Sequence, residues 1–294
     1  MINLQNMDGL EFLESVPDNS VDLILTDPPY ITSRETGMDK WVQHTQKQDE
    51  EGAQDAKTEK DWIEYKSVWH WLKWLHNSGV EDMKVAKKRL SKMKKDYIKY
   101  GSIYGKKYAV TTDYGEWDSK FTLEKLNLFI NHYFRVLRPG GTCIIFFDIW
   151  KITNLKNLLE DAKFKQIRFL EWIKTNPQPI NSKVNYLTNC REIALLGIKK
   201  SKPTFNSKYD NAIYHFPLQG GKDRFHPTQK SLPLFEELIR KHSNEGDLIL
   251  DTFAGSATTA IAAINTNRQF IGTELDEEFY NKSIERIQKT LDNC

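Results

Sequence analysis

The fold class follows from residues 248–264, LILDTFAGSATTAIAAI. The apolar start predicts a buried strand and the alanine-rich end a helix, joined by small residues around Gly255 that let a ligand approach the helix N-terminus. Asp251 ends the strand, and Glu274 ends the next expected strand, 269–274, where an acid suits hydrogen bonds to ribose hydroxyls. Neither a GxGxxG pattern nor a P-loop lysine is present, so pyrophosphate is disfavoured. An ordinary tight turn is the alternative, but it gives the two acids no role.

Apolar patterning on both sides of this stretch predicts alternating strands and helices. Strands are expected ahead of residue 8 and at 21–26, 142–148, 166–173, 192–199, 247–251 and 269–274. Helices are expected at 8–16, 123–137, 151–162, 233–242, 254–264 and 276–291. Residues 200–230 are polar and are interpreted as a loop. The alternation predicts an α/β, Rossmann-like fold whose mainly parallel sheet is covered by helices on both faces.

One long segment, residues 31–112, interrupts this alternation with polar, basic and tryptophan-rich sequence. Five of the eight tryptophans of the chain lie between positions 41 and 74. We interpret the segment as a largely helical insertion into a body formed by residues 1–30 and 113–294. The alternative is a second domain with a small core of its own.

The chain has 294 residues, and 42 Lys and Arg against 40 Asp and Glu give it a formal charge of +2. That average hides an asymmetry, because residues 81–107 carry a net +7 and the remainder therefore carries −5. No run approaches the roughly 20 apolar residues of a membrane span, and the start MINLQNMDGL does not resemble a signal peptide. Three scattered cysteines do not suit a disulfide framework. We therefore expect a cytoplasmic protein without a membrane partner.

A second stretch that could bind or act on a ligand, Asp27-Pro28-Pro29-Tyr30, follows the expected strand 21–26. Ligands of open α/β sheets bind at such carboxyl ends. Because prolines lack N–H donors, their carbonyls and the Asp27 carboxylate form a cluster of acceptors only. Such a cluster accepts both N–H groups of a substrate amine and leaves the nitrogen lone pair free, and Tyr30 offers a ring for stacking. A Pro-Pro turn capped by Asp27 is the alternative interpretation.

Together, the two stretches resemble the amino-directed DNA methyltransferases that use S-adenosylmethionine. Their order, with DPPY first and DTFAGS last, is similar to the β group of these enzymes, in which the motif order is circularly permuted. Further stretches resemble that group: GEWD at 115–118, RVLRPGG at 135–141, WIKTNP at 172–177 and HPTQK at 226–230. The chain departs from the family pattern at Ala257, usually glycine, and at Ser231, usually proline. Neither departure argues against the activity.

The resemblance implies a role for each matching residue. Asp27 and the Pro28 carbonyl would hold the target amino group, and Tyr30 would stack on the flipped base. The expected cofactor-binding residues are Asp8, Leu10, Thr228, Lys230, Asp251, Phe253, Ala254, Gly255, Ser256, Thr258 and Glu274. Of these, Glu274 would bind the ribose. Thr228 and Lys230 would bind the cofactor carboxylate, and Asp8 with Leu10 its adenine.

The implied reaction is methyl transfer from S-adenosylmethionine to N6 of adenine in DNA, because the Asp-initiated tetrapeptide resembles the adenine enzymes. Cytosine N4 and RNA are alternative acceptors, and a catalytically silent nucleic-acid-binding protein on this scaffold is a further alternative. Cytosine C5 methylation is disfavoured because no cysteine follows a proline. The seven histidines lack metal-ligand spacing, so we expect no metal. The expected partner is double-stranded DNA in a bacterial or phage setting, and a cognate restriction endonuclease and a homodimer are compatible with the resemblance.

Target recognition is expected mainly in residues 31–112, with residues 200–224 as a shorter candidate recognition loop. A helix over 81–99 would place an apolar stripe on one face: Met83, Ala86, Leu90, Met93 and Tyr97. Five lysines that share another face of this helix, and two that follow it, are expected to contact DNA phosphates: Lys84, Lys88, Lys92, Lys95, Lys99, Lys106 and Lys107. A solvated lysine face is the alternative. The core of the insertion is expected to contain Trp62, Tyr65, Trp69 and Leu72.

Overall fold

The computed structural model describes residues 1–30, 57–68, 83–100, 121–177, 190–220, 225–226 and 228–293. The chain divides into two compact units, which we call the sheet unit, residues 1–31 with 114–294, and the inserted unit, residues 32–113. Each unit has its own hydrophobic cluster among the described residues.

The sheet unit is built on an eight-stranded sheet with the order β1-β8-β7-β2-β3-β5-β4-β6. Its strands are β1 (Ile2–Asn6), β2 (Val21–Thr26), β3 (Leu137–Phe147), β4 (Lys165–Lys174), β5 (Arg191–Ile198), β6 (Ile213–Phe216), β7 (Leu248–Asp251) and β8 (Gln269–Glu274). β5 runs antiparallel to its neighbours β3 and β4, and every other neighbouring pair is parallel. The prediction of a mainly parallel sheet is confirmed.

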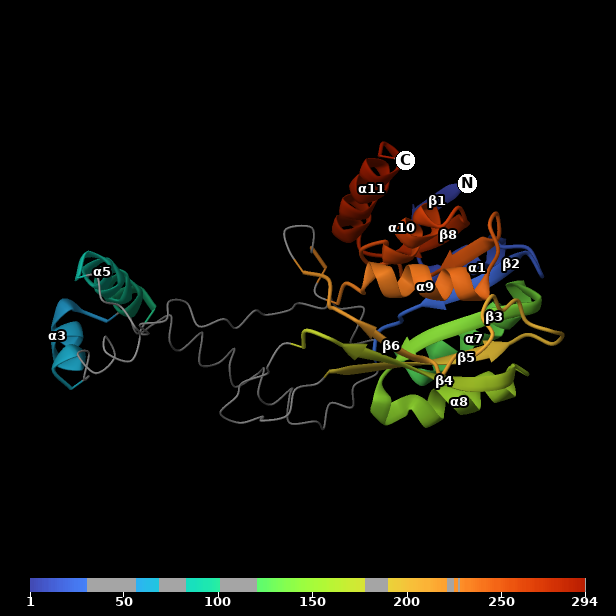
Figure 1. Ribbon diagram of the computed structural model, residues 1–294, viewed down its shortest axis with the longest axis horizontal. Helices are drawn as coiled ribbons and strands as arrows, with labels where there is room; N and C mark the ends of the chain where they lie inside the picture. The colour runs from blue at the N-terminus through green and yellow to red at the C-terminus, as the bar shows by residue number, and fades with distance from the viewer. Residues whose placement is uncertain are drawn as a thin grey trace. The chain divides into compact units, whose positions relative to one another are not determined.

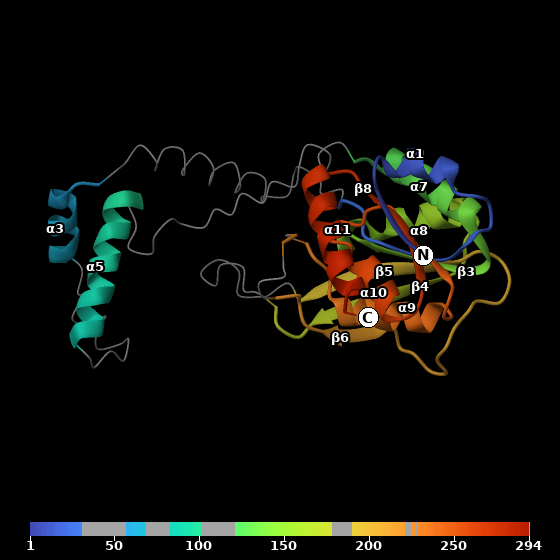
Figure 2. The same ribbon diagram turned by 90° about the horizontal axis from the view of Figure 1, so that it is seen from above.

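Helices cover both faces of this sheet (Figures 1 and 2). One face packs against α1 (Gly9–Ser15), α7 (Leu123–Val136) and α8 (Ile152–Asp161). The other packs against α9 (Leu232–His242), α10 (Thr258–Asn265) and α11 (Glu277–Leu291). A single 3-10 turn, η1 (Ile149–Lys151), joins β3 to α8. This is a doubly wound architecture, in which ligands bind beyond the carboxyl ends of the strands.

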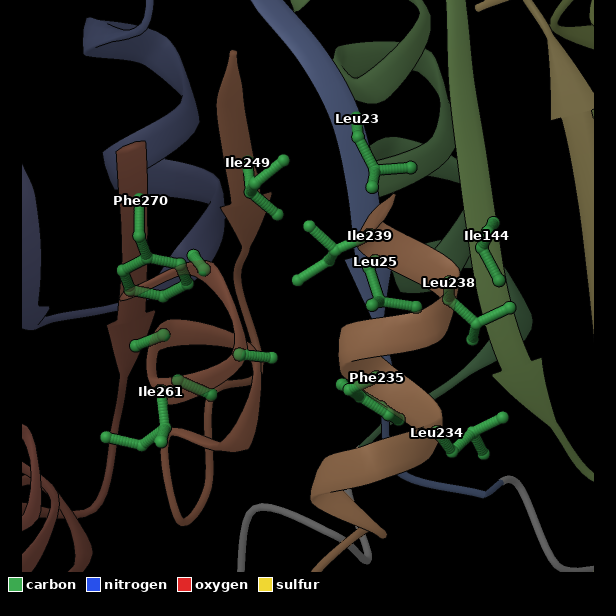
Figure 3. Packing of buried hydrophobic residues seen from close by; sticks show 14 of the residues in the cluster. Leu23, Leu25, Ile144, Leu234, Phe235, Leu238, Ile239, Ile249, Ile261 and Phe270 are labelled. Atoms are coloured by element: carbon green, nitrogen blue, oxygen red, sulfur yellow. The ribbon is translucent and has the colours of Figure 1, made fainter. Parts of the chain in front are cut away.

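The core follows from the apolar runs of the central strands. Alternate residues of β2 point to opposite faces, so Leu23 and Leu25 pack against α9 while Ile24 packs on the α7 side. Figure 3 shows the first of these layers, where Phe235 and Leu238 of α9 face the central strands. Each fully buried side chain of this size stabilises the fold by about 1.5–3 kcal/mol.

Three details differ from the sequence expectation. First, residues 200–230 are not all loop, because they contain β6, a four-residue edge strand paired only with β4. Second, β3 begins at Leu137 rather than 142, because Leu137 pairs with Val21 of β2 and the Gly140 N–H donates to Lys199 O beyond β5. Third, α10 begins at Thr258 rather than 254, because residues 254–257 form the turn that precedes it.

The described part of the inserted unit is a helix pair, α3 (Glu59–Val68) and α5 (Met83–Tyr100), seen side by side in Figures 1 and 2. Trp62 is 5% exposed and packs with Met93, and its ring lies 5.5 Å from that of Tyr97. Lys94 pairs with Glu59 at 2.7 Å across the two helices. The expected helix over 81–99 and the burial of Trp62 are thus observed, whereas the side chain of Tyr65 and residues Trp69 and Leu72 lie outside the described parts.

Within the described ranges, no helix is both long enough and apolar enough to cross a membrane.

Candidate functional site

The candidate site lies where β1, β8, β7, β2 and β3 end, because these neighbouring strands are parallel and finish at one edge of the sheet. Asp27 follows β2, Asp251 ends β7, and Glu274 ends β8. The strand order therefore sets three acids side by side that lie far apart in the sequence. This placement agrees with the sequence prediction for both the DPPY and the DTFAGS stretches.

Asp251 holds the central part of this edge together. Its carboxylate accepts hydrogen bonds from Thr26 Oγ1 at 2.7 Å and Thr259 Oγ1 at 2.6 Å, and from the Phe253 N–H at 3.0 Å. The residue is 3% exposed, and burial raises its pKa. Asp251 therefore connects β2, β7, the turn and α10 into one unit. Sequence reasoning assigned it to the cofactor and did not foresee this bonding.

Glu274 shapes the turn from the neighbouring strand. Its Oε2 accepts from the Gly255 N–H at 2.7 Å, and its Oε1 accepts from the Asp276 N–H at 2.9 Å. Burial raises the pKa of this carboxyl to about 7. Each oxygen has a further lone pair, so the carboxylate can also accept from ligand hydroxyls.

The turn itself needs left-handed backbone at two positions, Gly255 with φ +52° and Ala257 with φ +56°. Left-handed backbone is unfavourable for residues with a Cβ, so Ala257 is strained here in a way that glycine would not be. α11 anchors the turn, because Ser283 Oγ donates to Gly255 O and Arg286 donates to Ser256 O. The Ser256 and Thr258 hydroxyls lie 3.1 Å apart within the turn.

An aromatic wall adjoins the turn. The Phe253 ring lies 4.7 Å from that of Phe129 and 5.4 Å from that of Phe121, in a form suited to packing a flat ligand. Asp8 sits at the start of α1, where its Oδ1 accepts from the Leu10 N–H at 2.8 Å and its Oδ2 pairs with Lys125 at 3.2 Å. The Asp8 carboxylate is thus used to begin the helix, and any adenine contact would be additional.

The two carboxylate oxygens of Asp27 differ in their partners. Its Oδ2 lies 2.8 Å from the Lys230 ammonium, whereas its Oδ1 is buried with no hydrogen-bond partner among the described residues. Burial raises the pKa of Asp27 to about 6, against the opposing effect of Lys230. A buried acceptor without a donor is costly, so Oδ1 is suited to a ligand N–H.

Lys230 belongs to a buried ionic network that the sequence did not indicate. Its ammonium lies 2.5 Å from Glu192 Oε2, and Glu192 Oε1 lies 2.7 Å from Lys174. The two lysines hold the pKa of Glu192 below its ordinary value despite burial. The one available signal was an acid, Glu192, next to the start of a strand that is apolar from Ile193 onward, REIALLGI. Lys230 was expected to bind a cofactor carboxylate; in this structure its ammonium contacts two protein carboxylates.

Tyr30 contacts the same ionic network. Its ring meets Phe147 at 6.3 Å in an edge-on arrangement, and its hydroxyl lies 3.4 Å from the Lys230 ammonium. Lys230 also lies 5.3 Å from the centre of the Phe146 ring. Pro28 and Pro29 lie between Asp27 and Tyr30 on the loop that leaves β2.

The HPTQK stretch leads into α9. Thr228 Oγ1 lies 3.1 Å from His226 Nδ1, and the His226 ring packs against Phe279 of α11 at 4.4 Å. Gln229 is buried, and neither polar atom of its amide has a hydrogen-bond partner within the described ranges. The sequence reasoning left out this residue, although its amide offers both a donor and an acceptor.

These residues fit S-adenosylmethionine, which carries a sulfonium and an ammonium cation, ribose hydroxyls and a carboxylate. Asp27, Asp251 and Glu274 all have raised pKa values, and part of the effect on Asp27 and Glu274 comes from the Asp251 charge. A cation nearby would relieve this repulsion. The Gln229 amide offers both bonding partners that an amino-acid end requires. The described residues contain no cluster of His, Cys, Asp or Glu arranged for a metal ion.

The expected DNA-contacting lysines are only partly covered by the structure. Lys88, Lys92 and Lys95 are exposed on α5. Lys84 and Lys99 lie on the same helix, but their side chains are outside the described set, as are Lys106 and Lys107 entirely. In the candidate loop 200–224, Asn206 donates to the Arg240 and Ser243 carbonyls and thereby ties the loop to the end of α9.

Comparison with known proteins identifies relatives of this chain. A sequence profile of the N6/N4 methyltransferases, described as DNA methylase, matches residues 98–285. The type II methyltransferase M2.DpnII of Streptococcus pneumoniae is 32% identical over 200 residues, 61% of this chain and 74% of that protein. The type II methyltransferase M2.LlaDCHI of Lactococcus lactis subsp. cremoris is 30% identical over 199 residues, 61% of this chain and 74% of that protein.

Solved structures show the same fold. The complex of M1.HpyAVI with SAM aligns with a TM-score of 0.59 at 23% identity, over 98% of this chain and 99% of that one. PvuII DNA methyltransferase, described as cytosine-N4-specific, aligns with a TM-score of 0.60 at 15% identity, over 99% and 91% of the two chains. The Rossmann-like fold prediction is confirmed, and the family profile and type II relatives confirm the resemblance: this chain belongs to the N6/N4 DNA methylase family, the amino-directed, S-adenosylmethionine-dependent DNA methyltransferases.

Proposed function

We propose that this chain is a site-specific DNA methyltransferase that methylates the exocyclic N6 of adenine in double-stranded DNA, with S-adenosylmethionine as donor. The observation that carries the assignment of the acceptor site is Asp27 Oδ1, a buried acceptor with no donor among the described residues. An aromatic amino group supplies the N–H that this oxygen lacks. The relatives are type II methyltransferases and support a sequence-specific DNA substrate.

The Asp27 pocket would position the nucleophile. Asp27 Oδ1 accepts one N–H of the amine and the Pro28 carbonyl accepts the other, so the nitrogen lone pair is left for attack. Lys230 keeps Asp27 Oδ2 occupied and thereby fixes which oxygen faces the substrate. Tyr30 would stack on the base after it leaves the duplex.

Bound S-adenosylmethionine supplies an electrophilic methyl group on a sulfonium. The Asp251, Phe253, Ala254, Gly255, Ser256 and Thr258 stretch would line its methionine and ribose, with Glu274 on the ribose hydroxyls. Thr228 and Lys230 would face its carboxylate, and Asp8 with Leu10 its adenine. As the attacking nitrogen gains its methyl group it must lose a proton, and Asp27 Oδ1 is the acceptor already bonded to it. A pKa of about 6 suits that role near neutral pH.

Recognition of DNA would fall mainly to the inserted unit. The exposed lysines of α5 supply positive charge for phosphates. Residues 200–224 would contribute a shorter contact. A cytoplasmic location, a cognate restriction endonuclease and a homodimer belong to the same proposal, which needs no metal ion.

The test is a labelled-methyl assay. The chain is incubated with labelled S-adenosylmethionine and DNA of mixed sequence, and the DNA is then digested to nucleosides. Label in N6-methyladenine is the expected result. Label in N4-methylcytosine would establish the alternative acceptor, and an absence of label from every nucleoside would overturn DNA methylation.

Asp27→Ala provides the internal control for this assay. It removes the proposed acceptor without touching Asp251 or Glu274, so turnover should fall to background while cofactor affinity by calorimetry stays within about twofold. Asp161→Asn, at the exposed end of α8, is the matched variant and should retain full activity.

A further inference from the structure

Trp150 is an exposed tryptophan beside the proposed substrate pocket. It is 87% exposed, and its neighbour Ile149 is 48% exposed. Tryptophan is usually largely buried, because its ring contributes a large apolar area to the fold. Two adjacent apolar side chains at one turn therefore form a small exposed apolar patch that a partner can cover.

The strand pairing places this turn next to the pocket. β3 runs parallel to β2 with Thr26 opposite Ile145, so both strands end at the same sheet edge, Asp27 following one and Asp148 the other. The Tyr30 ring already contacts Phe147, the last residue of β3. Trp150 follows three residues later, beyond the same sheet edge.

The turn is held by its own backbone. Asp148 Oδ1 accepts from the Trp150 N–H at 2.9 Å, and Asp148 O accepts from the Lys151 N–H at 3.0 Å. α8 begins directly afterwards and is buried through Leu155 and Leu159. The exposed indole is thus carried by a backbone with fixed bonding, which is what a rigid contact residue requires.

The surroundings favour a nucleic-acid partner over an apolar protein. Lys151 belongs to the same turn. Arg191, the first residue of β5, lies at the same edge because β5 runs antiparallel to β3; its side chain pairs with Glu171 at 3.5 Å and stays 61% exposed. An aromatic ring flanked by cationic side chains suits stacked bases bordered by phosphates.

We propose that Trp150, supported by Ile149, is a wedge that enters the space left in the duplex when the target base is flipped out; this inference rests on the proposed function. Flipping breaks the stacking and pairing of one base. An apolar side chain that replaces the missing base restores part of the lost stacking, as inserted wedges do in other DNA complexes. Trp150 and Asp27 follow the ends of the neighbouring parallel strands β3 and β2, so a single DNA molecule would engage both.

The experiment compares Trp150→Ala with the unaltered chain on two duplexes. Both contain a site that the unaltered chain methylates; one has the target base paired, and the other has it mismatched, which lowers the cost of flipping. On the paired duplex we expect kcat/KM to fall about 5- to 150-fold, the range given by base–aromatic stacking. On the mismatched duplex the loss should be several-fold smaller, and Trp150→Phe should restore most of the activity on both.

Phe169→Ala is the matched control, because Phe169 is an aromatic residue 47% exposed within β4 and lies outside the proposed contact. It should leave kcat/KM unchanged on both duplexes. Equal losses for Trp150→Ala on the two duplexes, or no loss on either, would overturn the wedge. Failure of the proposed function would appear as no methylation of DNA by the unaltered chain, and the wedge would fail with it. Failure of the wedge alone would leave the unaltered chain active, so the two failures are distinguishable.

Discussion

The Lys230 ammonium lies 2.8 Å from Asp27 Oδ2 and 2.5 Å from Glu192 Oε2, so one cation joins the end of β2 to the start of β5. Lys230 is only 7% exposed. Buried charges are tolerated when partners satisfy them, and here the chain Asp27–Lys230–Glu192–Lys174 alternates in sign. The arrangement binds one Asp27 oxygen inside the protein and leaves the other for substrate.

The first prediction concerns the pH dependence of turnover. Asp27 must be ionised to accept the substrate amino group, so kcat/KM should rise with pH through about 6, the raised pKa of Asp27. Lys230 lowers that pKa and Glu192 raises it. Lys230→Met should therefore move the acidic limb to higher pH, and Glu192→Gln should move it to lower pH.

The two variants are informative as a pair, because they alter the same network and have opposite expected signs. Glu171→Gln is the control, since Glu171 pairs with Arg191 at 3.5 Å and belongs to a separate ion pair. It should leave the limb in place. Shifts of the same sign for Lys230→Met and Glu192→Gln would show that the network does not set the ionisation of Asp27.

The second prediction concerns cofactor affinity and Glu274. Its pKa of about 7 means that the carboxyl is largely protonated at pH 6 and ionised at pH 8. A cationic ligand that donates ribose hydroxyls binds the ionised form better, so S-adenosylmethionine affinity should increase from pH 6 to pH 8. Calorimetry over this range should show a much flatter response in Glu274→Gln, whereas Glu277→Gln, in the exposed first turn of α11, should behave like the unaltered chain.

The same titration should appear in the stability of the cofactor-free chain. The folded state raises the Glu274 pKa from 4.5 to about 7, so it binds more protons than the unfolded state between those values. The free energy of unfolding should consequently fall as pH rises through this window. Denaturant titrations of Glu274→Gln should lose that part of the slope; an unchanged slope would show that Glu274 does not titrate there.

A third prediction separates structural from ligand-binding roles at Asp251. Asp251→Ala leaves two buried threonine hydroxyls and the Phe253 N–H without their acceptor. Each unsatisfied buried group costs about 1–3 kcal/mol, and three groups lose their acceptor. The free energy of unfolding should therefore drop by more than one such cost. Thr259→Val removes a single donor and should cost about 1–2 kcal/mol. Equal losses of unfolding free energy for Asp251→Ala and Thr259→Val in urea titrations would contradict the central position of Asp251.

A fourth prediction tests the cationic face of α5. Lys88, Lys92 and Lys95 are exposed, unlike Lys94, which pairs with Glu59. Replacing the three by Gln should weaken DNA binding and reduce the steepness of log K against log salt by about 2.7, or 0.9 for each lost phosphate contact. Three exposed lysines of the sheet unit serve as the control: Lys156, Lys163 and Lys289. An unchanged salt slope in the α5 variant would support the solvated lysine face instead.

The sequence alone determined the fold class, because buried parallel strands and amphipathic helices leave periodic apolar patterns that local reasoning can follow. It also located Asp27, Asp251 and Glu274 correctly at strand ends. It missed β6, since a four-residue edge strand with Ile213 half exposed has little apolar signal. It likewise placed the start of β3 five residues late, because the strand begins at a pairing of Leu137 with Val21, which lies far away in the sequence.

Only the tertiary structure decided how the acids of the site are used. The strand order β8-β7-β2 makes neighbours of Glu274, Asp251 and Asp27. Burial raises the pKa values of all three, and the Asp251 charge adds to the rise at Asp27 and Glu274. The Lys230–Glu192 contact spans 38 positions in the sequence and depends on an antiparallel strand within a parallel sheet. The residue types of a site are local properties of the chain, whereas the charges that act on them come from whichever elements the packing brings together.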